Sequence, residues 1–181
     1  MMLGSLVWKK ELSSKRDPMF EEARVVPKLL RQEVKLIREI GESYPEQACI
    51  AFDRFIRLPA FALNDVLPHV YAYFRDTYEW DEMAGELPKE LDNIRVPEEV
   101  WQYVEPESLM LEEDEGKWFV CLEAECAWEP EHGLQIVWLG GNEIIKVGEC
   151  DGHVTNVNAW DDPSLDRVVH KARDPRWTTT R

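Results

Sequence analysis

The stretch WFVCLEAECAWEPEHGLQIVWLGGNEIIKVGECDG, residues 118–152, decides the fold because strand periodicity and turn signals follow one another along it. From Trp118 to Trp128 every even position is apolar, whereas the odd positions include Glu123 and Glu125. Alternation with a period of two is typical of a strand that has one buried face and one polar face. The stretch therefore begins with a strand whose carboxylates face away from the core.

Two turn signals divide the remainder of this stretch. Pro130 and Gly133 interrupt the alternation, which then resumes as it does after a hairpin loop built around a type I turn. The Gly-Gly-Asn sequence at 140–142 marks a second reversal, and residues 143–147 form a third short strand. We therefore predict a three-stranded antiparallel meander over 118–148, whose apolar face needs a helical cover.

The first turn also carries a resemblance to a known family. Residues 127–134, AWEPEHGL, together with Gly141 and residues 147–148, resemble the Trp-x-x-Glu-His-Gly-Leu signature of the bacterial DUF6985-type family of unassigned function. The resemblance implies an α+β domain and, by association, a place among the immunity proteins of bacterial toxin systems. It implies no catalytic residues.

Length and charge restrict the classes of protein that fit. The chain has 181 residues, of which 44% are hydrophobic, so it is long enough for one domain with a substantial core. Its formal net charge is −15. Binding to nucleic acid or to anionic membranes requires basic surface, so we expect neither partner. A basic protein partner is compatible with this charge.

The cysteines and the N-terminus point to a cytoplasmic protein. The chain has no Cys-x-x-Cys pair, and Cys121 and Cys126 fall on opposite faces of one strand, so they cannot bridge each other. We therefore expect reduced thiols. No secretion signal is evident at the N-terminus, and no segment approaches the length of a membrane span.

Residues 1–40 are predicted to hold N-terminal strands. Over 20–40 the apolar positions fit either strand alternation or helical spacing, and so short a window does not separate the two. Pro27 opposes one long helix. Two strands, at about 20–27 and 33–40, are the favoured interpretation, and a helix is the alternative.

Residues 43–105 are predicted to form the helical layer. A start signal at Ser43 precedes apolar residues at helical spacing that continue to Pro59. Asn64 is the expected cap of a second helix with an aromatic stripe, which ends before Gly85. These two main helices are expected to cover the sheet.

The helical layer is predicted to end in a third, short helix. Pro97 occupies its first position and Pro106 is the expected stop. Residues 109–117 then lead as a strand into an exposed hairpin turn before the meander.

The C-terminal part completes a single α+β domain. The meander region is assigned to 109–160, with 154–160 as a fourth strand or an ordered coil. Asp162 and the proline after it begin a short helix within 161–181, and residues 177–181 are expected to be a loose tail. The predicted fold is an antiparallel sheet, made of the meander and the N-terminal strands, under two main helices.

Acidic residues are concentrated in the middle of the chain. Between Asp76 and Glu131 there are 19 acidic residues and only three basic ones. Such a surface either serves solubility or docks a basic protein, because acidic patches speed association with cationic partners. Nuclease and deaminase toxins have cationic clefts, so a basic protein toxin is the expected partner. The candidate binding residues are Glu112, Glu113, Asp114, Glu115, Glu123 and Glu125.

A second candidate is a metal site at one edge of the meander. The first and third strands run in the same direction, so the loop after one and the turn after the other share an edge of the sheet. That places Glu131 and His132 near Asp151 and His153, whose oxygen and imidazole ligands suit a divalent cation. The alternative is that these side chains fix the two turns, because no standard zinc-ligand spacing is present.

Nucleophilic catalysis has little support in the sequence. There is no Gly-x-Ser-x-Gly motif, and the four histidines define no triad. The leading hypothesis is a non-catalytic acidic binding protein without a cofactor, with immunity to a cognate toxin as its role. The alternatives are a metal-dependent enzyme and an uncharacterised housekeeping domain.

Overall fold

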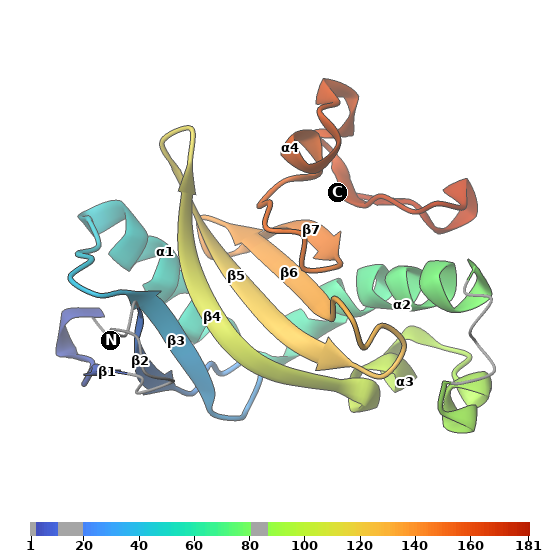
Figure 1. Cartoon of the computed structure of the whole chain (residues 1–181), viewed down its shortest axis with the longest axis horizontal. Coiled ribbons are helices and arrows are strands. Elements are labelled where there is room, and N and C mark those ends of the chain that lie inside the picture. The colour runs from blue at the N-terminus through green and yellow to red at the C-terminus, as the bar shows by residue number, and fades with distance from the viewer. Residues whose placement is uncertain (1–2, 11–19, 81–86) are drawn as a thin grey trace.

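Seven strands form the central sheet of the computed structural model, which describes residues 3–10, 20–80 and 87–181 (Figure 1). The order of the strands in the sheet follows their order in the chain. They are β1 (Lys9–Lys10), β2 (Phe20–Val25), β3 (Val34–Glu39), β4 (Val104–Asp114), β5 (Lys117–Cys126), β6 (Leu134–Leu139) and β7 (Glu143–Gly148). Neighbours are antiparallel except β3 and β4, which are parallel because the helical layer returns the chain between them.

Two main helices, α1 (Glu46–Arg57) and α2 (Leu63–Trp80), pass behind the sheet in Figure 1 and cover one of its faces. The short helix α3 (Pro97–Val100) follows, and 3-10 turns at Ala60–Ala62, Lys89–Asn93 and Trp101–Tyr103 complete the layer. The α+β prediction is thus confirmed. Within the described ranges, none of the helices combines the length and the apolar character that crossing a membrane demands.

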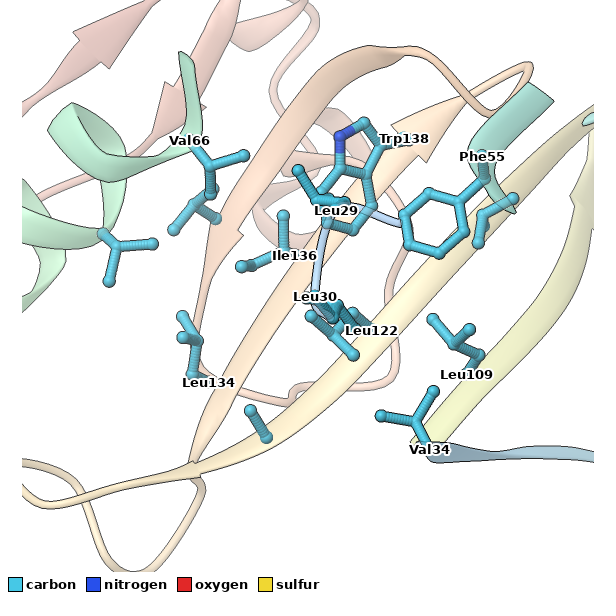
Figure 2. Close-up of a cluster of buried hydrophobic side chains, with 14 of the residues drawn as sticks. Leu29, Leu30, Val34, Phe55, Val66, Leu109, Leu122, Leu134, Ile136 and Trp138 are labelled. Atoms are coloured by element: carbon cyan, nitrogen blue, oxygen red, sulfur yellow. The ribbon is translucent and has the colours of Figure 1, made fainter. Parts of the chain in front are cut away.

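The apolar face of the meander forms the centre of the core. Leu122 on β5 and Ile136 on β6 are directly opposite each other in register, and both are fully buried. Figure 2 shows Trp138 beside Phe55, and their ring centroids are 4.8 Å apart. Burial of a side chain of this size contributes roughly 1.5–3 kcal/mol, so this face supplies much of the driving force for folding.

The opposite face of the meander is partly buried as well. Phe119 and Cys121 on β5 pack with Val137 and Ile145 in a smaller cluster, which Val154 helps to cover. This face was predicted to be polar because Glu123 and Glu125 occupy it further along the strand. The C-terminal segment is what allows apolar residues at the Phe119 end.

Two of the three predictions for the C-terminal segment are wrong, whereas Asp162 does cap a helical turn, a 3-10 helix at Pro163–Leu165. Residues 154–160 are neither strand nor coil, because Asn156–Trp160 form helix α4, whose N-terminal amide at Asn158 donates to the Thr155 hydroxyl at 3.1 Å. Residues 177–181 are not a loose tail, because Thr179–Thr180 form β9 and pair with β8 (Val168–His170). The Asn156 side chain donates to the Val168 and Val169 carbonyls, each at 2.9 Å, and thereby ties α4 to β8.

Two predicted boundaries in the helical layer are also wrong. Asn64 is not a cap, because α2 begins at Leu63, directly after the 3-10 turn. Pro106 does not mark the end of a helix that is followed by a strand from 109. It lies inside β4, where a bulge between Pro106 and Ser108 tolerates its missing N–H group. By contrast, β2 and β3 confirm the choice of two strands over a helix in 20–40.

Gly141 fixes the distance between the sheet and α1. It has φ +82°, and a Cβ atom there would lie 1.8 Å from the carbonyl oxygen of Ala51. Gly116, in the hairpin between β4 and β5, has a similar φ of +76° but open space around it. Substitutions at Gly116 and Gly141 therefore distinguish the cost of backbone strain alone from the cost of strain together with a steric clash.

We expect Gly141→Ala to lower the free energy of unfolding by more than about 3 kcal/mol, because the helix must move away from the sheet. Gly116→Ala should cost only about 1–2 kcal/mol from its left-handed backbone. Urea unfolding of both variants measures the difference. Equal losses would show that Gly141 does not set the packing distance.

Candidate functional site

A cleft of about 950 Å³ lies where β4 begins and β5 ends, and the loop at 127–133 forms one wall. We call it the acidic cleft. Among the described residues, no lysine or arginine lines it. Its six carboxylates belong to Glu105, Glu107, Glu123, Glu125, Glu129 and Glu131.

Strand pairing forces several of these carboxylates together. Glu105 and Glu125 are direct partners in the register of β4 and β5. The bulge places Glu107 beside them, and Glu123 faces Ser108, whose hydroxyl donates to it at 3.4 Å. Like charges directly opposite each other destabilise a sheet. A positively charged ligand in the cleft would relieve this repulsion.

The loop that closes the cleft is held by the residues of the signature motif. The Glu129 carboxylate accepts the backbone N–H groups of Glu131 and His132, both at 3.2 Å. Gly133 has φ +67° and approaches Ala124 so closely that a Cβ atom would lie 2.6 Å from its carbonyl oxygen. The Tyr73 hydroxyl donates to the Gly133 carbonyl at 3.0 Å. The motif therefore builds a rigid loop that presents Glu131 and His132 to solvent.

The structure divides the predicted acidic residues between two places. Glu123 and Glu125 line the acidic cleft. Residues 112–115 lie towards the hairpin tip at the other end of β4, roughly 14 to 24 Å from Glu123 by strand rise. Burial raises the pKa of the Glu112 carboxyl, and the charges of Glu42, Glu123 and Glu39 add to this rise. The Asp114 carboxylate accepts the Asn158 side-chain amide at 2.8 Å.

Glu105 and Glu107 were not among the predicted site residues. They were missed because Pro106 was taken as the end of a helix, which removed its neighbours from the sheet. Their spacing of two residues was the available signal, since it puts both on one side of an extended strand.

The two turns of the predicted metal edge do lie side by side. The Cys150 backbone N–H donates to the His132 carbonyl at 3.3 Å. His132 Nδ1 lies 3.3 Å from Glu129, and Glu131 is exposed. The Asp151 carboxylate accepts the backbone N–H of His153 at 2.9 Å and is ion-paired with Lys146. Within the described residues, no three His, Cys, Asp or Glu side chains converge as metal ligands. The metal site stays a prediction.

Lys146 is a buried cation on the outer face of the sheet. Its side chain is only 3% exposed, and its ammonium donates to Asp151, to the Gln135 amide oxygen at 3.0 Å and to the His153 carbonyl at 2.8 Å. Burial lowers the pKa of Lys146, while the Asp151 carboxylate opposes that change. Asp151 therefore stabilises the fold by compensating a buried charge.

Asp151→Asn should lower the free energy of unfolding by about 3 kcal/mol, because it leaves the Lys146 ammonium buried without its anion. Glu149→Gln, an exposed change in the same turn, should alter it by less than about 0.5 kcal/mol. Chemical denaturation of both variants without added metal is the measurement. Similar stability of the two variants would show that Asp151 does not have this structural role.

A second cavity, of about 300 Å³, lies between α2, β7 and the C-terminal segment. We call it the small cavity. It is lined by Asp76 and His170, which are 5% and 4% exposed. The Asp76 carboxylate accepts the backbone N–H groups of Arg173 and Asp174 at 2.9 and 2.8 Å. These bonds attach the C-terminal segment to α2.

His170 has one satisfied nitrogen and one that is not. Its Nδ1 lies 3.1 Å from the Val147 carbonyl oxygen, an acceptor, so Nδ1 carries the proton. Its Nε2 is buried without a hydrogen-bond partner, 3.9 Å from Asp76 Oδ2. Burial lowers the pKa of His170 to about 4. Neither His170 nor Asp76 was predicted, because Asp76 lies outside the apolar stripe of α2 and meets His170 only in the folded chain.

The depressed pKa of His170 makes stability dependent on pH. The folded state binds fewer protons than the unfolded state between the unfolded value of about 6.5 and the folded value of about 4. The contribution of His170 to the free energy of unfolding is therefore complete above about pH 6.5. It is lost as the pH falls towards 4, by up to about 3 kcal/mol.

We expect His170→Gln to show a smaller loss of stability than the wild type between pH 7 and pH 4. Urea unfolding over this range gives the comparison, in which the carboxylates common to both proteins cancel. Parallel curves would mean that His170 keeps its ordinary pKa in the folded protein.

The thiols near the acidic cleft are not activated. Cys126 and Cys150 line it, and burial raises the pKa of each thiol to about 12. Both are protonated at neutral pH, and a protonated thiol is a poor nucleophile. All four cysteines are free, as the sequence predicted.

Comparison with known proteins identifies one family. The model of DUF6985, a domain of unknown function, matches residues 8–154. This span includes the sheet, the helical layer and the acidic cleft, and it ends before α4. No curated protein and no solved structure matches the chain.

Proposed function

The chain belongs to the DUF6985 family of domains of unknown function, and we propose that it is a non-catalytic binding protein whose acidic cleft receives a cationic segment of a partner protein. The observation that carries this proposal is the concentration of six carboxylates in a cleft that no described lysine or arginine lines. Lysine and arginine side chains of a partner would form charge-assisted hydrogen bonds there.

The repulsion between opposed carboxylates in the acidic cleft supports a binding role. Glu105 and Glu125 face each other directly, and no ion pair among the described residues compensates either one. A sheet that served only solubility would gain stability by separating these charges. Complementary charge also raises the rate of association and excludes anionic partners.

The cognate partner that we propose is a basic protein toxin, and the role is immunity in a bacterial cytoplasm. A toxin that acts on nucleic acid needs a cationic surface, and that surface is complementary to the acidic cleft. The net charge of −15 adds long-range attraction to such a partner.

The test uses a ten-residue oligolysine peptide as the cationic probe. The triple variant Glu105→Gln, Glu107→Gln, Glu125→Gln should bind it at least about tenfold more weakly than the wild type at low salt. The matched control Glu112→Gln, Glu113→Gln, Glu115→Gln removes the same charge towards the hairpin tip and should bind within about twofold of the wild type at about 0.15 M salt, where the Debye length is roughly 8 Å. Isothermal titration calorimetry at two salt concentrations measures both.

Stability of the same variants provides a second measurement. The cleft variant should be more stable than the wild type by roughly 0.5–1 kcal/mol, because it removes repulsion between opposed carboxylates. Weaker binding by a more stable protein cannot be attributed to unfolding. If the two triple variants lost peptide binding equally, net charge alone would explain the loss. That result would contradict specific binding in the acidic cleft.

A further inference from the structure

The small cavity brings two buried acceptors together without a donor between them. His170 Nε2 has no hydrogen-bond partner, and the nearest acidic oxygen, Asp76 Oδ2, lies 3.9 Å away. Both residues are more than nine-tenths buried. Buried polar atoms in folded proteins nearly always have partners, so the unpartnered His170 Nε2 indicates a missing donor, although Asp76 Oδ2 already accepts the Arg173 backbone N–H.

The two side chains do not satisfy each other at neutral pH. His170 commits its proton on Nδ1 to the Val147 carbonyl, and Nε2 keeps a lone pair because the pKa of the ring is about 4. Asp76 can only accept when it is ionised, so two acceptors oppose each other. The missing group must therefore supply N–H or O–H bonds.

Charge distinguishes a cation from a neutral donor. Asp76 receives only backbone N–H groups, and in the part of the chain that the structure describes no lysine or arginine is ion-paired with it. Lys146, which also lines the cavity, is already paired with Asp151. A buried carboxylate needs a compensating positive charge.

The walls of the cavity suit a small organic cation. Glu129 and Glu149 add carboxylates to the lining, which also includes Lys171 and Arg173. Trp160, which is 57% exposed, provides an aromatic surface at the same cavity, and Lys171 Nζ lies 5.4 Å from the centre of its ring. A volume of about 300 Å³ is at the small end of ligand sites. An ammonium nitrogen about 2.9 Å from both acceptors would subtend an angle of roughly 85° between them, which two of its N–H bonds can serve.

We propose that the small cavity binds a small primary ammonium compound, whose head group donates to His170 Nε2 and to Asp76 Oδ2. Within the described part of the chain, the site shares only Glu129 with the residues that line the acidic cleft, and it does not depend on the function proposed for that cleft. The side chains that hold the head group come from α2 and from β8, so binding also links the C-terminal segment to the helical layer.

The test uses n-butylammonium as the probe and butan-1-ol as its neutral match. Long-range ¹H–¹⁵N spectra of the histidine rings at pH 7 report on His170 Nε2. Butylammonium should shift this resonance saturably, whereas butanol at the same concentration should not. Asp76→Asn should weaken butylammonium binding at least about tenfold, because it removes the charge while keeping the shape.

Two further variants keep the test decisive. If Asp76→Asn does not fold, His170→Gln takes its place, with isothermal titration calorimetry as the measure of binding, and the same tenfold loss is expected. The cleft variant Glu105→Gln, Glu107→Gln, Glu125→Gln should show the same saturable shift of the His170 Nε2 resonance with butylammonium as the wild type does.

Several results would overturn the proposal. These are an unsaturable response, an equal response to butanol, a His170 ring that is already protonated at pH 7, or unchanged affinity in the substituted proteins. A crystal soaked in butylammonium that shows only an ordered water between His170 and Asp76 would also overturn it, because the water would then be the missing donor.

Discussion

Trp138 packs against Phe55 with their ring centroids 4.8 Å apart, and this contact joins the central sheet to α1. At the end of the same strand, Gly141 brings the turn against the backbone of Ala51, at a distance that no side chain allows. Together they set the spacing between sheet and helix. Every inward residue of β5 and β6 depends on that spacing, because protein interiors are packed to the density of crystals.

Both candidate sites follow from this arrangement. Once the even positions of β5 face the helices, Glu123 and Glu125 must face outward, and the register brings Glu105 against Glu125. The signature loop then closes the acidic cleft through Gly133. The small cavity has a different origin. It forms where α2 meets the C-terminal segment, and the part of that segment after residue 154 lies outside the family match.

Local periodicity predicted those parts of the fold whose partners are close in the sequence. The meander, the two main helices and the helix beginning at Pro97 were predicted correctly because each carries its own apolar pattern. The helix α4 and the pairing of β8 with β9 were not, because distant contacts such as the one from Asn156 to Val168 stabilise them. The same limit applies to the sites. Glu105 meets Glu125 only through the pairing of β4 with β5, and Asp76 meets His170 only in the folded chain.

We propose that the acidic cleft recognises a cationic protein. Affinity capture from the native cell lysate, with the wild type and the cleft variant as parallel baits at low and high salt, is the measurement that addresses this role. We expect mass spectrometry to find one basic protein in stoichiometric amount on the wild type at low salt, and we expect the cleft variant not to retain it. Recovery of the same proteins by both baits would contradict the claim, as would a wild type that retains no partner and carries a bound divalent metal.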